Sequence, residues 1–176
     1  MHPTEAKRCY RTVFLSDLHL GTRGCRSDFL IDFLNRVECE RLFLVGDIVD
    51  GWRLRKSWYW DARHDEVIGL LLRAARNGTE VTYIPGNHDE ALRDWLGMEI
   101  AGVRLVNEAV HAGADGRRHC GYPYWSLSQW LKRQVTEVVR AIDRCEIALV
   151  EHADGRFELI DWARENRLSF VHPEPR

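Results

Sequence analysis

The stretch TVFLSDLH at residues 12–19 joins an apolar run to a polar end. Two later stretches have the same design, LFLVGD at residues 42–47 and VTYIPGNHD at residues 81–89. Continuous apolar runs of this length are typical of strands that are buried on both faces of a sheet. The three stretches therefore predict three buried strands, each followed at once by Gly, Asp, Asn or His.

Helical patterns separate these strands. Apolar side chains within residues 28–36 recur at helical spacing behind a candidate N-cap, Ser27, and a second helix is predicted from about residue 65 to residue 76. Asn77 and Gly78 then supply a helix-ending signal. Strands that alternate with helices predict an α/β fold with a mainly parallel sheet. Such sheets bind ligands at the carboxyl ends of their strands.

Beyond residue 100 the pattern changes to hairpins and one long helix. Asp-Gly pairs lie between short apolar runs at two places, which is a hairpin signal. A third segment keeps helical spacing of its apolar residues and predicts an amphipathic helix. The predicted elements are strands at 103–110 with 117–120 and at 148–152 with 157–162, a helix over 126–143, and a frayed tail over 165–176.

Length and composition are those of an ordinary globular protein. With 176 residues, 45% of them hydrophobic and 30% charged, the chain is predicted to form one packed domain over residues 1–176. A formal charge of −2 disfavours a nucleic-acid phosphodiesterase, which would need a basic surface. The apolar runs are strand-sized, no secretory signal is recognisable, and the five cysteines form no C-x-x-C pair. We therefore expect a cytoplasmic protein.

The polar residues after the first two strands have the chemistry of a metal site. Asp17 and His19 are two positions apart, so an extended chain would point both side chains to one side. Asp47 offers a carboxylate, whose two oxygens can bridge two divalent cations. Each residue also fits a role in loop capping or local hydrogen bonding. Polar motifs at three successive strand ends favour the metal site.

The third motif, GNHD at residues 86–89, offers three more functions. The carbonyl of Asn87 can bind a hard or borderline cation, and His88 can donate a proton to a phosphoryl oxygen or a leaving group. Asp89 can hold His88 in one tautomer. The alternative interpretation of the motif is an ordinary turn. Mixed nitrogen and oxygen ligands suit Mn²⁺, Fe²⁺ or Zn²⁺.

Three motifs resemble those that open the calcineurin-like metallophosphoesterases: SDLHLG at 16–21, GDIVDG at 46–51 and GNHD at 86–89. Two further segments, GWRLR at 51–55 and YPYWSLS at 122–128, are similar to the UDP-2,3-diacylglucosamine pyrophosphatase-like branch. The resemblance covers nearly the whole chain. It implies an α/β fold, a β-sandwich flanked by helices, with a two-metal site at the strand ends.

The resemblance also implies a role for each motif residue. Asp17 and His19 would hold one metal, Asp47 would bridge, Asn87 would hold the second metal, and His88 would be the catalytic histidine. The implied cofactors are two divalent ions, Mn²⁺ first, with Fe²⁺ or Zn²⁺ as alternatives. The implied reaction is hydrolysis of the pyrophosphate of UDP-2,3-diacylglucosamine, or of a related phosphoester, by a metal-activated hydroxide during lipid A synthesis.

The sequence departs from that family in its second half. The later family motifs, His-Gly-Asp and Gly-His-x-His, whose histidines complete both metal shells, have no counterpart here. We interpret this as the absence of two internal stretches, one near Cys120 and one between Asp143 and Ile147. The alternative function is that of a shortened, catalytically impaired relative that acts as a binding or vestigial protein. The remaining candidate ligands are four isolated histidines, His111, His119, His152 and His172.

Basic and aromatic residues interleave from Trp52 to Trp60, directly after the second motif. We expect Trp52 and Arg53 to bind substrate and Arg23 to face a phosphate near the metals. The alternatives are tryptophans that pack on the sheet and a solvated Arg23. Such a segment also fits an anionic lipid headgroup or a membrane surface. The expected partners are a phosphoester, nucleotide-linked and lipid-bearing by resemblance, and the inner membrane face, with no nucleic acid.

Overall fold

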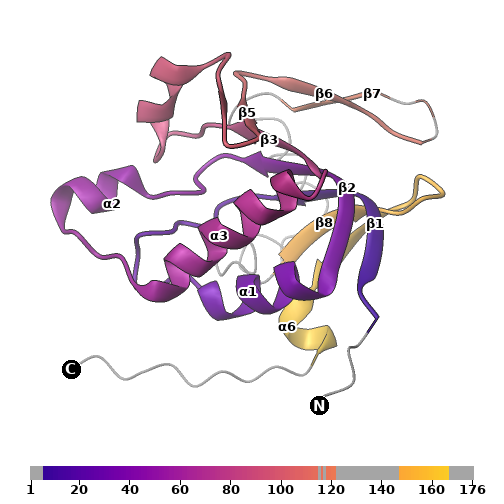
Figure 1. Ribbon diagram of the computed structural model, residues 1–176, viewed down its shortest axis with the longest axis horizontal. Coiled ribbons are helices and arrows are strands. Elements are labelled where there is room, and N and C mark those ends of the chain that lie inside the picture. The colour runs from indigo at the N-terminus through magenta and orange to yellow at the C-terminus, as the bar shows by residue number, and fades with distance from the viewer. Residues whose placement is uncertain (1–5, 115, 117, 122–146, 167–176) are drawn as a thin grey trace.

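The computed structural model describes residues 6–114, 116, 118–121 and 147–166 (Figure 1). The helix expected over 126–143 and most of the tail expected over 165–176 lie outside the described residues. No helix in the described ranges is long and apolar enough to span a membrane.

A seven-stranded sheet forms the centre of the molecule, with the strand order β4-β5-β3-β2-β1-β8-β9. Its middle is parallel and consists of β1 (Arg8–Leu15), β2 (Val37–Val45), β3 (Glu80–Ile84) and β5 (Val103–Leu105). Its edges are antiparallel and consist of β4 (Glu99–Ile100), β8 (Ile147–Glu151) and β9 (Phe157–Asp161). The predicted α/β class is therefore confirmed, and the predicted parallel pairing holds for the middle of the sheet, whereas its edges are antiparallel.

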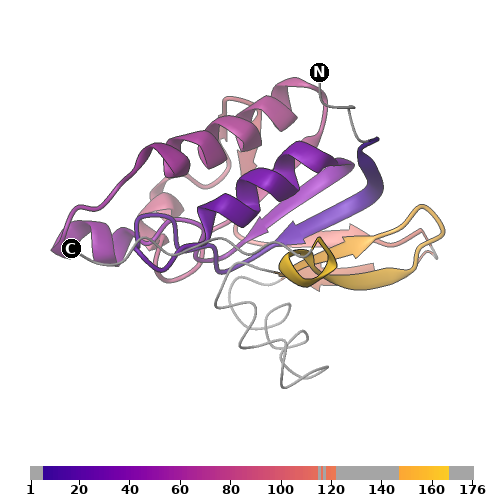
Figure 2. The same cartoon turned by 90° about the horizontal axis from the view of Figure 1, so that it is seen from below.

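Two helices, α1 (Ser27–Arg36) and α3 (Ala62–Arg76), cover one face of this sheet (Figure 2). Val13 and Leu42 are paired across β1 and β2 and belong to the core that these helices share. The next pair, Phe14 and Phe43, stacks at a ring distance of 5.0 Å in a second apolar cluster. Alternating side chains thus bury both faces of the central strands, as their continuous apolar runs predicted.

Helix starts differ slightly from the prediction. Ser27 is the first residue of α1 and not its cap, since Arg26 holds the capping position without a side-chain bond. Helix α3 begins at residue 62 because the carboxylate of Asp61 accepts bonds from the backbone N–H groups of Arg63 and His64. A short helix, α2 (Gly51–Lys56), begins directly after the second motif, where the sequence predicts no helix.

Both Asp-Gly hairpins are confirmed, one by β8 and β9 and the other by β6 (Ala109–Ala112) with β7 (Arg118–Gly121). The predicted strand over 103–110 is in fact two strands, β5 and β6, because β5 joins the parallel sheet while β6 belongs to the separate two-stranded sheet. Two short helices complete the described chain, the 3-10 helix η1 (Glu90–Trp95) and α6 (Trp162–Glu165).

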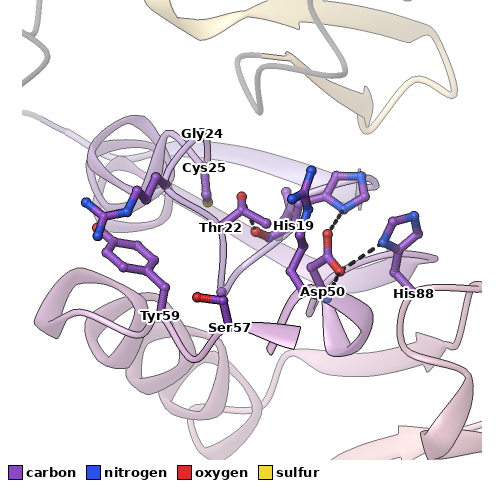
Figure 3. Close-up of a pocket in the computed structure, with 12 residues that line it drawn as sticks. His19, Thr22, Gly24, Cys25, Asp50, Ser57, Tyr59 and His88 are labelled. Carbon is purple, nitrogen blue, oxygen red and sulfur yellow. Dashed lines mark hydrogen bonds and ion pairs between the residues drawn. The ribbon is translucent and has the colours of Figure 1, made fainter. Parts of the chain in front are cut away.

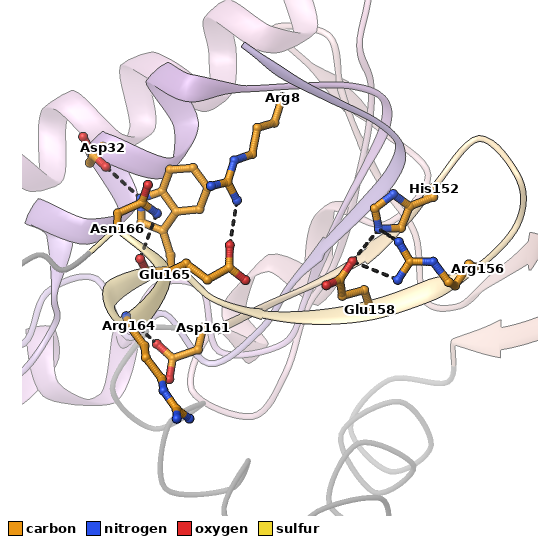
Figure 4. Close-up of polar contacts among 10 residues, drawn as sticks. Arg8, Asp32, His152, Arg156, Glu158, Asp161, Arg164, Glu165 and Asn166 are labelled. Atoms are coloured by element: carbon orange, nitrogen blue, oxygen red, sulfur yellow. Dashed lines mark hydrogen bonds and ion pairs between the residues drawn. The ribbon is translucent and has the colours of Figure 1, made fainter. Parts of the chain in front are cut away.

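Helix α6 is fastened to the N-terminal half of the chain. The indole Nε1 of Trp162 donates to Asp32 of α1 at 2.8 Å, and Arg8 of β1 forms an ion pair with Glu165 at 2.7 Å (Figure 4). These contacts fix α6, which directly follows β9, to α1 and β1.

Candidate metal centre

The three polar motifs meet at the carboxyl ends of β1, β2 and β3. Backbone hydrogen bonds join the first motif to the second, from Asp17 N–H to Gly46 at 3.1 Å and from His19 N–H to Asp47 at 2.9 Å. The second motif is joined to the third, because Asp47 Oδ1 accepts from the backbone N–H of His88 at 2.9 Å. The motifs therefore form one connected structure, as the parallel sheet requires.

The loops around this centre are strained. Asp17, His19 and Asp47 have φ angles of 57°, 49° and 55°, in the left-handed region. Such a conformation costs of order 1–3 kcal/mol for a residue other than glycine. The expectation that Asp17 and His19 converge on an extended strand is therefore wrong, because β1 ends at Leu15. They converge through a tightly curled loop.

Asp17, His19 and Asp47 form a group whose possible ligand atoms all lie within 4.8 Å of one another. Two carboxylates and one imidazole suit a borderline divalent cation such as Mn²⁺, Fe²⁺ or Zn²⁺. The third motif lies very close to the second, since a Cβ at Gly86 would overlap with Asp47. The residues present therefore fit one metal ion.

Asn87 adds a second observation that fits a cation. Its side-chain Oδ1 is buried and has no hydrogen-bond partner within the described part of the chain. A buried carbonyl oxygen without a donor normally costs about 1–3 kcal/mol. A cation bound at Oδ1 would remove that cost, so the orphan oxygen supports the expected ligand role of Asn87.

Asp50 lies between His19 and His88 and was not predicted as a site residue. Its Oδ1 is 3.0 Å from His88 Nδ1 and its Oδ2 is 3.4 Å from His19 Nδ1 (Figure 3). Both are ion-pair distances without full hydrogen-bond geometry. Each ring thus turns Nδ1 toward Asp50, which leaves Nε2 available for a metal or a substrate. The signal in the sequence was the second acid of GDIVD, three residues after Asp47.

The local structure keeps Asp50 ionised. Burial raises the pKa of its carboxyl group, but the neighbouring His88, the backbone N–H of Arg53 and the charge of His19 lower it further, so the net pKa lies below its usual value. Asp50 also caps α2 by accepting from Arg53 N–H at 2.8 Å. This bond holds the carboxylate of Asp50 in place beside Nδ1 of His88.

The predicted contact between Asp89 and His88 is wrong. The buried carboxylate of Asp89 accepts from the hydroxyl of Tyr83 at 2.5 Å, from Ile48 N–H at 3.0 Å and from Gly86 N–H. The chain turns back toward the sheet after His88, which carries Asp89 into the interior. Asp89 therefore joins the second and third motifs through their backbones, and Asp50 takes the place beside His88.

The three expected substrate-binding residues surround the same region. The indole of Trp52 packs on the imidazole of His88, with ring centroids 4.5 Å apart, and donates from Nε1 to Glu90 at 3.3 Å. Arg23 and Arg53 line a cavity of about 610 Å³ that also contains His19, Asp50 and His88. The structure thus brings the arginines and the histidines to one cavity.

Two of the isolated histidines have local partners. His111 Nε2 lies 2.8 Å from Glu151, and His152 Nε2 lies 2.7 Å from Glu158, which also pairs with Arg156 (Figure 4). Neither histidine belongs to a metal-compatible group among the described residues. His172 and the side chain of His119 lie outside the described residues.

The sequence matches a known protein family. The family model of the calcineurin-like phosphoesterases matches residues 10–176. The chain therefore belongs to the calcineurin-like phosphoesterase family, whose members use divalent metals.

A more particular likeness is to the UDP-2,3-diacylglucosamine hydrolase of Porphyromonas gingivalis (strain ATCC BAA-308 / W83). The two sequences are 26% identical over 97 residues, which is 51% of this chain and 37% of that protein. The match thus spans little more than a third of the relative's length.

Proposed function

We propose that this chain is a metal-dependent phosphoesterase whose centre lies at the carboxyl ends of β1, β2 and β3. The observation that carries the proposal is the convergence of Asp17, His19 and Asp47 on a position where one ion fits. Family membership supports it, because the residues that converge are those of the family-like motifs.

The proposed ligands divide between two ions that share Asp47. Asp17 and His19 complete the first position, and the buried carbonyl of Asn87 contributes to the second. Bound divalent ions, Mn²⁺ first, would polarise the phosphoryl group and supply hydroxide at neutral pH. This donor set and the resemblance together favour a dinuclear centre.

His88 is the proposed proton donor to the leaving oxygen. Asp50 lies beside Nδ1, so Nε2 is the nitrogen that would donate to the substrate. The indole of Trp52 packs on the imidazole ring of His88 and so limits the rotation of that ring. The residues around His88 thus orient one nitrogen toward the substrate.

The proposed substrate is UDP-2,3-diacylglucosamine or a related nucleotide-linked lipid, cleaved at its pyrophosphate in lipid A synthesis. The family-like motifs and the P. gingivalis relative support this choice. Trp52 and Trp58 are 47% and 77% exposed, and α2 carries cations at Arg53, Arg55 and Lys56. Exposed indoles beside cations suit the headgroup region of an anionic membrane. Contact with the cytoplasmic face of the inner membrane is therefore part of the proposal.

The test uses the full chain, stripped of metal by a chelator and then titrated with Mn²⁺. Hydrolysis of bis(p-nitrophenyl) phosphate should appear only with metal and should be lost in Asp17→Asn. Glu165→Gln serves as a control because it lies on α6 and pairs with Arg8. No hydrolysis with Mn²⁺, Fe²⁺ or Zn²⁺, or hydrolysis that persists without metal, would contradict the proposal.

The second candidate function is that of a catalytically impaired relative. It is favoured by the ligand count of the second ion, for which Asp47 and Asn87 are the proposed ligands within the described ranges, while the later family motifs are missing from the sequence. Calorimetric titration with Mn²⁺ should then show one tight ion and one weak ion, with slow turnover. Two equally tight ions would exclude this candidate.

A further inference from the structure

His19 belongs to a second group of side chains that has the composition of a metal site. With Asp50 and His88 it offers three possible ligand atoms, all within 4.8 Å of one another. This group shares only His19 with the centre that also contains Asp17 and Asp47. Two metal-compatible groups therefore lie next to each other and have one histidine in common.

The two histidines of this group turn buried nitrogens toward the carboxylate between them. Nδ1 of His19 and Nδ1 of His88 are both buried and have no hydrogen-bond partner among the residues that the structure describes. They lie 3.4 and 3.0 Å from the two oxygens of Asp50 (Figure 3). Ligand atoms around a tetrahedral Zn²⁺ ion are about 3.3–3.4 Å apart, because each bond to the ion is about 2.0–2.1 Å long. The spacing and the two orphan nitrogens thus fit an ion that all three residues share.

Local contacts hold the three residues in this arrangement before any ion binds. The carbonyl of His88 accepts from Gly51 N–H at 2.9 Å, and the carboxylate of Asp50 accepts from Arg53 N–H at 2.8 Å. The imidazole rings of His19 and His88 pack edge to face, with centroids 4.8 Å apart and planes at 81°. An ion would therefore bind ligands that are already in place, at a low cost in conformational entropy.

The same group is open to solvent on one side. His19, Asp50 and His88 line the cavity of about 610 Å³. The side chains of the two histidines are 27% and 26% exposed, although their Nδ1 atoms are buried. A metal site needs such a path of entry, and water from the cavity can complete the coordination of an ion with three protein ligands.

The two metal-compatible groups differ in the ions that suit them. Asp17, His19 and Asp47 supply two carboxylates and one nitrogen, and oxygen ligands suit Mn²⁺. His19, Asp50 and His88 supply two nitrogens and one carboxylate, a ligand set found in zinc sites that keep an open position. Affinity for a given set of ligands is generally higher for Zn²⁺ than for Mn²⁺. The nitrogen-rich group therefore favours Zn²⁺.

We propose that His19, Asp50 and His88 form an inhibitory binding site for Zn²⁺. A neutral imidazole has one nitrogen with a free lone pair, so His19 bound through Nδ1 is lost as a ligand of the Mn²⁺ centre. The same ion holds His88, the proposed proton donor. Excess Zn²⁺ thus removes two residues from the reaction. The inhibition rests on the proposed function, whereas the binding site itself does not.

Binding is measured first on the full, metal-free chain, by competition for Zn²⁺ with a fluorescent chelator. The Asp17→Asn variant isolates the proposed site, because it lacks a ligand of the Mn²⁺ centre, and it should lose affinity for Mn²⁺ but retain Zn²⁺. Adding His88→Gln to this variant should weaken Zn²⁺ binding roughly 10-fold or more. Adding His152→Gln is the matched control, since His152 pairs with Glu158 and is not in the cavity lining. Loss of Zn²⁺ binding in Asp17→Asn alone, or equal effects of the two histidine changes, would overturn the inference.

A second measurement identifies the coordinating nitrogens and needs no substitution at His88. Heteronuclear NMR spectra of the histidine rings in Asp17→Asn should show that Zn²⁺ shifts the Nδ1 resonances of His19 and His88. Their Nε2 atoms should stay protonated, and the ring of His152 should be unaffected. Coordination through Nε2, or a response of His19 without His88, would overturn the inference.

Kinetics then test the inhibition with Mn²⁺ bound. Added Zn²⁺ should lower the hydrolysis of bis(p-nitrophenyl) phosphate, and a zinc-selective chelator should restore it. Asp50→Asn keeps an oxygen to cap α2 but lacks the charge, so half-inhibition should need roughly 10-fold more Zn²⁺ despite slower turnover. Equal sensitivity of Asp50→Asn and wild type would overturn the inhibitory role. Absent Mn²⁺-dependent hydrolysis with intact, His88-dependent Zn²⁺ binding would count against the proposed function alone.

Discussion

Two histidine–carboxylate pairs in this molecule have similar distances and different surroundings. His88 and Asp50 approach to 3.0 Å at the strand ends, and His111 and Glu151 approach to 2.8 Å where β6 meets β8. The side chain of His88 is 26% exposed, whereas that of His111 is 3% exposed. One pair opens into a cavity and the other is enclosed.

The carboxylates differ even more than the histidines. Glu151 is completely buried and accepts from the side chains of Arg11, Thr12 and His111 and from the backbone N–H of Ala114. The buried charge of Glu151 is paired with Arg11 and fully hydrogen-bonded, so this carboxylate has a structural role. Asp50 instead serves two histidines that keep Nε2 available. The comparison indicates that a histidine beside a carboxylate can act in catalysis only where its other ring nitrogen faces open space.

The largest expected effect is at Asp47, the residue that would bridge the two ions. Asp47→Ala should lower Mn²⁺-dependent kcat/KM roughly 10³-fold or more, because the loss of a shared ligand removes several kcal/mol of charge stabilisation. Steady-state kinetics and metal analysis by mass spectrometry provide the measurements. Wild-type turnover with a full complement of metal would show that the proposed centre is wrong.

The next effects distinguish His88 from His111. His88→Ala should reduce kcat by roughly 10²–10⁴-fold with metal still bound, as expected for the loss of a proton donor. Asp50→Asn should reduce kcat by roughly 10–100-fold, because the carboxylate that orients Nδ1 of His88 is lost. His111→Gln should leave kcat unchanged. Loss of metal in His88→Ala would recast His88 as a ligand.

The fold was largely predictable because it depends on local patterns. Continuous apolar runs identified β1, β2 and β3, and Asp-Gly signals identified both hairpins. The start of α3 was missed because Asp61, its cap, directly follows the aromatic segment from Trp52 to Trp60, where no helical period is visible. Residues that directly follow a buried strand could be found as site candidates, since strand ends of a parallel sheet converge.

The pairing of acids with histidines could not be predicted. It depends on the left-handed backbone at Asp17, His19 and Asp47, which curls the loops and decides where the next side chain points. Sequence adjacency favoured Asp89 as the partner of His88. The backbone turns Asp89 inward, and the capping geometry of α2 presents Asp50 instead. Such choices arise from contacts between loops and not from periodicity.

A stability measurement tests the structural role of Glu151, the carboxylate of the enclosed pair. Glu151→Gln should lower the free energy of unfolding by about 3 kcal/mol, because it leaves Arg11 without its buried partner. Urea denaturation measures the loss, and kcat at low temperature should not change. Lys7→Gln is the control, since its pair with Glu38 is exposed and should contribute at most about 1 kcal/mol. A large fall in kcat with unchanged stability would place Glu151 in the chemistry.

The pair of His111 and Glu151 also predicts how stability depends on pH. Burial lowers the pKa of His111 below 6.5, against the opposing effect of Glu151, so the unfolded chain binds more protons there and stability falls as the pH drops below about 6.5. Burial raises the pKa of Glu151, but bonds from Ala114, Thr12, His111 and Arg11 lower it below 4.5, so a second loss begins below about pH 4.5. Glu151→Gln should remove the second loss in urea titrations at several pH values. An unchanged acid limb would contradict this assignment.

The smallest effect is expected at a third buried carboxylate, Asp89, which lies next to the centre but bonds like Glu151. Tyr83→Phe removes one of its three donors, so unfolding should become easier by about 1–3 kcal/mol. Because Ile48 and Gly86 still hold Asp89, Mn²⁺ affinity should fall less than 10-fold with kcat unchanged. Tyr59→Phe is the control for loss of a hydroxyl and should leave Mn²⁺ affinity unchanged. If Tyr83→Phe instead lowered kcat as strongly as His88→Ala while stability was retained, Asp89 would support catalysis like Asp50 and would not be a purely structural carboxylate like Glu151.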